Sequence, residues 1–98
     1  MKQAWLLITG IVFSFTANAA DIEAGQAKAA VCAACHGADG MAILPTYPNL
    51  KGQNAPYLEK QLNAFRSGER NDPLMTPMAK PLSDEDVKNL AAYYQSLK

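Results

Sequence analysis

Five consecutive residues, Cys32-Ala33-Ala34-Cys35-His36, constrain this chain more than any other feature. Two cysteines separated by two residues can place both thiols on one side of a helical turn, within reach of two vinyl groups of one porphyrin. The histidine that follows directly can bind the iron of the same macrocycle, so the pattern is typical of covalent haem attachment. Cys32 and Cys35 are the only cysteines and His36 is the only histidine. A single haem c with its iron is therefore the expected cofactor.

The start of the chain has the pattern of an export signal. Lys2 supplies a positive charge, residues 4–15 are mostly apolar, and residues 17–19 form a small-x-small cleavage pattern. A membrane anchor is the alternative interpretation. It fits less well, because a transmembrane helix needs about 20 apolar residues and this stretch is shorter and interrupted.

Removal of a signal peptide over residues 1–19, with cleavage after Ala19 or Ala20, would leave one domain over residues 20–98 in the periplasm, with no membrane span. So small a domain is marginal on its own core, and a covalently held apolar group would stabilise it. Of nine basic residues only Lys2 lies in the leader, which leaves eight against nine acidic residues. A mature chain so close to neutral has no nucleic-acid-binding character.

Three helices are predicted, with no alternating strand pattern, so the fold class is all-α. The first begins near Asp21 and continues through the cysteine motif, which forms its last turn. The second is capped by Asn54 and ends at Gly68. The third is capped by Ser83 and carries acidic residues in its first turn, where the helix dipole favours them.

Two segments rich in proline and glycine separate these helices. Residues 37–53 and residues 69–81 are both predicted to be irregular loops. Long loops in a small domain need something to order them, and a ligand packed between them would do so.

The iron needs a second axial ligand, and a single histidine excludes a bis-histidine site. Methionine is the soft thioether donor that raises the reduction potential of haem iron. The mature chain offers Met41, Met75 and Met78. Met41 follows His36 by only five residues, so its backbone is expected to stay on the histidine side of the haem. Met75 and Met78 both remain candidates, because their loop can cross to the opposite face.

These features together resemble the class I c-type cytochromes. The resemblance is carried by residues 32–40, 47–53 and 75–87, and it covers essentially the whole mature chain. It is closest to the small soluble monohaem cytochromes c of bacterial periplasm and to single halves of periplasmic dihaem cytochromes c. It implies the class I cytochrome c fold, with three main helices around one covalently attached haem.

The same resemblance implies roles for particular residues. The carbonyl of Pro48 would accept a hydrogen bond from Nδ1 of His36 and so orient the imidazole. Met75 would be the sixth ligand of the iron, and Met78 would pack nearby as part of the apolar wall. Met78 is the alternative ligand. Gly25 and Tyr94 would form the close crossing of the first and last helices.

Two other readings of the cysteine pair are weaker. A catalytic dithiol or disulfide normally lies in a βαβ setting, which an all-α pattern lacks. A zinc site normally takes four ligands, of which cysteine and histidine can supply only three here.

Several surface side chains carry secondary hypotheses. A docking patch for an acidic redox partner would need one-sided positive charge, for which the candidates are Lys28, Lys51, Lys60, Lys80 and Lys88. The haem propionates would be reached by polar side chains chosen from Tyr47, Gln53, Tyr57, Gln61 and Arg66. Tyr93 is expected to be partly exposed.

The preferred function is a mobile electron carrier that passes one electron between redox partner proteins, membrane-bound or soluble. With both axial positions filled, no substrate can bind the iron, so the chain is not expected to be an enzyme. One alternative is a haem enzyme or gas sensor with an open distal site. The other is the haem-containing subunit of a larger oxidoreductase.

Overall fold

The computed structural model describes residue 10 and residues 19–98, so the predicted signal peptide lies almost wholly outside the described residues. The described part is helical, without strands, as the sequence predicts. Its elements are α1 (Ile22–Lys28), a 3-10 turn (Ala29–Val31), α2 (Ala33–His36), α3 (Ala55–Ser67), α4 (Met75–Ala79) and α5 (Asp84–Ser96). No helix in this part of the chain is long and apolar enough to cross a membrane.

The first predicted helix is divided into three segments. Asp21 caps α1 through a hydrogen bond from the Ala24 amide to Oδ1, at 3.1 Å. The chain then tightens into a 3-10 turn, where the Cys32 amide donates to the Ala29 carbonyl at 2.9 Å. Such turns are common at helix ends, and they leave the side-chain period nearly unchanged, so the sequence does not reveal the break. The break places Cys32 at the junction between the 3-10 turn and α2.

Helix α3 begins and ends where the sequence predicts, and α5 begins at its predicted cap. Oδ1 of Asn54 accepts from the Tyr57 amide at 3.1 Å, and Gly68 ends α3 in the left-handed conformation, with φ of +81°. Ser83 and Asp86 form a reciprocal capping box at the start of α5. Both starts follow from side chains that satisfy otherwise unpaired backbone groups.

The sequence pattern predicts an irregular loop over residues 69–81. This prediction is wrong in part, because the segment contains α4. Asp72 supplies the start signal by accepting from the amides of Leu74 and Met75. Pro77 is tolerated because it lies in the first turn, where backbone amides have no helical partner. A five-residue helix is too short to show an apolar period, which explains why the sequence pattern missed it.

The loop over residues 37–53 is held by its own backbone. The Gly40 carbonyl accepts from the amides of Leu50 and Lys51, at 2.7 and 3.1 Å. The Gly52 amide donates to the Tyr94 carbonyl on α5, at 2.8 Å. The loop is therefore closed on itself and fixed to the last helix by these backbone hydrogen bonds.

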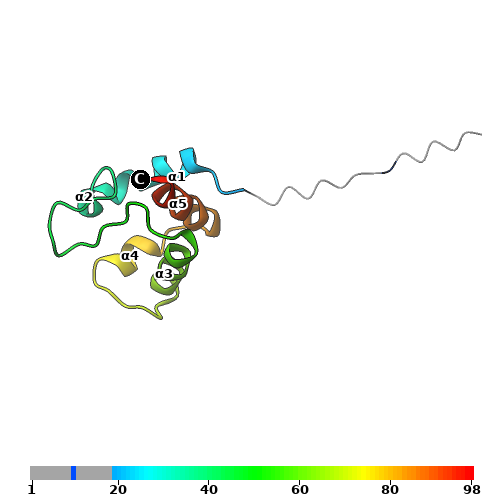
Figure 1. Ribbon diagram of the computed structural model, residues 1–98. Coiled ribbons are helices and arrows are strands. Elements are labelled where there is room, and N and C mark those ends of the chain that lie inside the picture. Colours follow the sequence, from blue (N-terminus) through cyan, green and yellow to red (C-terminus); the bar gives the residue numbers. More distant parts are fainter. Residues whose placement is uncertain (1–9, 11–18) are drawn as a thin grey trace, which may run out of the picture.

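Helix α5 packs against both α1 and α3, and α4 packs against α3 (Figure 1). The crossing with α1 is close because Gly25 faces the backbone of Asn89 and Cβ of Tyr93. The predicted pairing of Gly25 with Tyr94 is therefore wrong by one residue. Tyr93 is 7% exposed, not partly exposed as expected, because it lies at this crossing.

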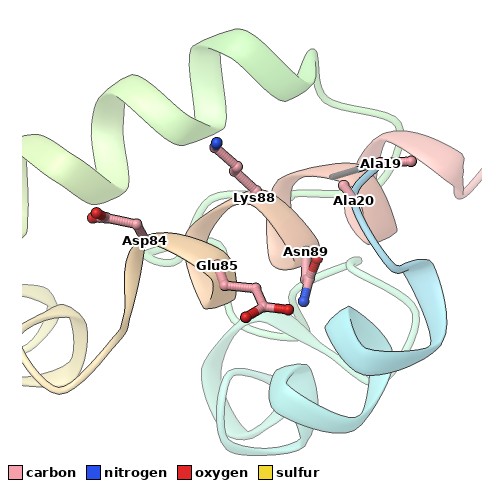
Figure 2. Close-up of a pocket in the computed structure, with 6 residues that line it drawn as sticks. All are labelled: Ala19, Ala20, Asp84, Glu85, Lys88 and Asn89. Atoms are coloured by element: carbon pink, nitrogen blue, oxygen red, sulfur yellow. The ribbon is translucent and has the colours of Figure 1, made fainter. Parts of the chain in front are cut away.

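Asn89 fixes the entry of the chain into α1. Its Oδ1 accepts from the Asp21 amide at 2.8 Å, and its side chain is buried. Figure 2 shows Asn89 beside the segment that runs from Ala20 into α1, where both line a small pocket.

Replacement of Asn89 by alanine is expected to lower the free energy of unfolding by about 1–2 kcal/mol, because the Asp21 amide loses its partner. Guanidinium titration of the holoprotein measures this change. Asn63→Ala is the matched control, because Asn63 is exposed and bonds only Arg66 within α3. An equal loss in both variants would contradict a special role for Asn89.

Candidate haem-binding site

A cavity of about 640 Å³ opens between the helices, within the size range of cofactor sites. Its walls are mostly apolar side chains, namely Val31, Leu50, Leu58, Leu62, Phe65, Leu74, Ala79, Leu82, Leu90 and Ala91. Cys32, Cys35, His36, Met75 and Met78 all line it as well. An apolar cavity that gathers two thiols, an imidazole and two thioethers fits a covalently held haem in both size and donor chemistry.

His36 is the buried ligand candidate, at 6% exposure. Its Nδ1 lies 2.8 Å from the carbonyl oxygen of Pro48. A carbonyl oxygen can only accept a hydrogen bond, so Nδ1 carries the proton and Nε2 keeps its lone pair for a metal. The hydrogen bond also fixes the orientation of the ring, as the outer partners of metal-binding histidines do.

The two cysteines lie on a single turn. The Cys32 carbonyl accepts from the amides of Cys35 and His36, at 3.2 and 2.9 Å, which brings both half-buried thiols to the cavity. Burial raises the pKa of the Cys32 thiol, although a hydrogen bond from Tyr94 acts in the opposite direction. Catalytic dithiols need a lowered thiol pKa, so Cys32 does not fit the dithiol alternative.

The described residues offer no cluster of side chains for a zinc site. Within the described residues, no group of three histidine, cysteine, aspartate or glutamate side chains is placed to hold a metal ion. The imidazole and the sulfur atoms at the cavity suit haem iron.

The three methionines have different surroundings. Met75 is half-buried and packs against the core, and it lines the cavity. Met78 also lines the cavity but is 47% exposed. Met41 is 46% exposed and is not among the residues that line the cavity. Burial thus favours Met75 over Met78 as a fixed ligand, and Met41 lies away from the site.

Four of the five polar side chains that the sequence offered for the haem propionates lie on the cavity wall. Tyr47, Gln53, Tyr57 and Gln61 do line the cavity. Arg66 does not, because its guanidinium bonds Asp84 and Asn63 instead, at 2.8 and 2.9 Å.

Arg70, which the sequence reasoning missed, is the one lysine or arginine among the lining residues. Its guanidinium lies 4.5 Å from the centre of the Phe65 ring and donates to Gln61 at 2.7 Å. Gly68 is the sequence feature that could have placed Arg70 at the cavity, because a left-handed helix end turns the following residues back onto α3.

The predicted lysine patch is not part of this site. None of the five lysines lines the cavity, and Lys28 pairs with Asp86 at 3.4 Å. Lys88 lines the small pocket beside Asn89 (Figure 2).

Comparison with known proteins agrees with this geometry. Residues 22–98 match the family model described as cytochrome c. The chain belongs to the cytochrome c family. Cytochrome c-554(548) of Halomonas halodenitrificans is 54% identical over 81 residues, which cover 80% of this chain and 98% of that protein. Reduced cytochrome c4 from Pseudomonas stutzeri superimposes with a TM-score of 0.77 and 46% identity, over 82% of this chain and 47% of that structure.

A further relative, from Stutzerimonas stutzeri strain A1501, is named a thiosulfate dehydrogenase electron acceptor. It is 40% identical over 92% of this chain and 45% of its own length. The chain thus spans about half the length of its cytochrome c4 and electron-acceptor relatives, and nearly all of the Halomonas cytochrome. Membership in the family implies a covalently bound haem c with its iron, and a function in electron transfer.

Proposed function

We propose that the protein is a periplasmic one-electron carrier, in which thioether bonds from Cys32 and Cys35 hold the haem and His36 and Met75 bind its iron. The observation that carries the proposal is that His36, with Nδ1 engaged by Pro48, shares one apolar cavity with the half-buried Met75. The bound haem supplies a reversible change between Fe(II) and Fe(III).

The chain would orient the His36 imidazole and exclude water from the haem site. The bond to Pro48 holds the imidazole in one tautomer, so the ring would not turn when the charge of the site changes. The apolar wall keeps the site at low dielectric, which disfavours the extra positive charge of the oxidised state. The thioether of Met75 favours the reduced state further, so both effects raise the reduction potential.

A carrier with two protein ligands leaves no position for a substrate, so we propose that the chain is not an enzyme by itself. Spectroelectrochemical titration of the holoprotein is expected to give a reversible one-electron curve with the same ligands in both states. A haem enzyme or gas sensor would instead lose or exchange a ligand during the titration.

The partners would be electron-donating or electron-accepting proteins of the periplasm. The name of the Stutzerimonas relative suggests a dehydrogenase as one class of donor, and a haem subunit within such an oxidoreductase is the second candidate function. Purification of the native protein tests this, because a carrier is expected to elute alone and a subunit to co-elute with its enzyme. Its intact mass tests export, since cleavage after Ala19 or Ala20 fixes the expected value.

Arg70 is proposed to neutralise carboxylates of the haem, because it is the cation on the cavity wall. Arg70→Ala is expected to lower the reduction potential by about 20–40 mV, since a lost positive charge destabilises the reduced state by about 0.5–1 kcal/mol. Arg66→Ala is the matched control, because Arg66 faces Asp84 away from the cavity. Equal shifts in the two variants would contradict the assignment.

A further inference from the structure

We propose that Asp72 and Thr76, here called the clamp, are positioning residues that hold the Met75 thioether on the iron. The inference rests on the assignment of Met75 as the sixth ligand under Proposed function. It concerns how the chain fixes that ligand, since a methionine side chain has three rotatable bonds and does not fix its own position.

Asp72 fixes the backbone of the ligand itself. Its Oδ1 accepts from the amides of Leu74 and Met75, at 2.9 and 2.8 Å. Hydrogen bonds to an ionised carboxylate are shorter and stronger than those between neutral groups. The two bonds together define the direction in which α4 begins, and with it the direction of the Met75 side chain.

Thr76 closes the clamp from the other side. Its hydroxyl accepts from the Asp72 amide at 2.8 Å and donates to the Arg70 carbonyl at 3.3 Å. The Thr76 amide also donates to the Asp72 carbonyl, at 3.1 Å. Thr76 is buried, so these bonds are protected from exchange with water.

The clamp is tied to α3 through Arg70. The Arg70 amide donates to the Ala64 carbonyl at 3.0 Å, and its guanidinium stacks on Phe65. A continuous set of bonds therefore runs from α3 through Arg70, Thr76 and Asp72 to the Met75 amide. This set matters because α4 has only five residues, and so short a helix is not stable by itself.

The expected consequence is resistance of the iron–thioether bond to competing ligands. Imidazole titration of the oxidised holoprotein measures it, because imidazole can bind only when the thioether has left the iron. Asp72→Ala and Thr76→Val are each expected to bind imidazole about tenfold more tightly than the wild type, since each loses two hydrogen bonds beside Met75. Covalent attachment at Cys32 and Cys35 would keep the haem in both variants.

Two variants serve as matched comparisons. Asp72→Asn keeps a side-chain oxygen that can accept both amides, so it is expected to stay within about threefold of the wild type. Asp39→Ala removes a similar bond, from the Met41 amide to the Asp39 carboxylate at 3.1 Å, away from the cavity. It is expected to leave imidazole binding unchanged.

The outcomes separate the clamp from the ligand assignment. Wild-type affinity in both Asp72→Ala and Thr76→Val, with tight binding in Met75→Ala, would overturn the clamp and leave Met75 as the ligand. Wild-type affinity in Met75→Ala would overturn the ligand assignment instead. Equal tightening in Asp39→Ala would show general loosening of the fold and also overturn the clamp.

Discussion

Replacement of Met75 by alanine is expected to lower the reduction potential by about 0.1–0.3 V, within the range of about 0.8 V that axial ligands span in haem proteins. The weak thioether-to-iron band of the oxidised protein should disappear at the same time. The reason is that a soft sulfur donor stabilises Fe(II), and water or no ligand would take its place. Spectroelectrochemistry of the holoprotein gives both readouts.

Met78→Ala is the matched control. Met78 lies on the same short helix, α4, and lines the same cavity, but it is exposed. In this variant we expect the thioether-to-iron band to remain and the reduction potential to change only slightly, through greater access of water to the haem. If the band is lost in Met78→Ala and kept in Met75→Ala, the two methionines exchange their roles.

Replacement of Gly25 by alanine is expected to destabilise the fold by about 3 kcal/mol, because overpacking against backbone cannot be relieved by a side-chain rotation. A Cβ on Gly25 would lie 2.6 Å from the carbonyl carbon of Asn89 and 2.9 Å from Cβ of Tyr93. Either α1 or α5 must then move. Thermal unfolding of the holoprotein should shift down by roughly 12–24 °C.

Gly68→Ala separates this steric effect from the general cost of replacing a glycine. Gly68 has φ of +81°, and a Cβ added there would meet no other atom within 4 Å. Only backbone strain of about 1 kcal/mol is therefore expected. A loss at Gly25 no larger than that at Gly68 would contradict the close crossing of α1 and α5.

The parts of the fold that could be predicted are those that depend on residues close together in the sequence. Asn54, Gly68 and Ser83 mark their helix ends through side-chain and backbone preferences that need no tertiary information. The all-α class followed from the period of the apolar residues in α3 and α5. These signals arise within a few residues, so the sequence contains them directly.

The parts that were missed depend on contacts distant in sequence or on elements too short to show a period. Arg70 reaches the cavity only because the chain folds back after Gly68, and Arg66 is drawn away by Asp84 on another helix. The partner of Gly25 differs by one residue because the rotation of α5 about its axis is set by packing against α1. Helix α4 depends on its cap at Asp72.

At the candidate site, the candidate donor atoms could be named from the sequence, whereas their burial and hydrogen bonds come from the structure. The motif over residues 32–36 named the thiols and the imidazole, and the nearness of Met41 to His36 in the sequence left Met75 and Met78 as candidates for the second axial ligand. Burial distinguishes Met75 from Met78, and the bond to Pro48 shows which nitrogen of His36 is free. The family resemblance implied both roles, and the structure adds the burial of the methionines and the distance between His36 and Pro48, which a pattern of residue types does not contain.

Closure of the iron by two protein ligands is tested most directly by carbon monoxide binding to the reduced wild-type holoprotein at neutral pH. With His36 and Met75 both bound, we expect a low-spin spectrum and very slow binding, because the thioether must first leave the iron. A high-spin spectrum with rapid carbon monoxide binding would contradict the carrier and favour an open site.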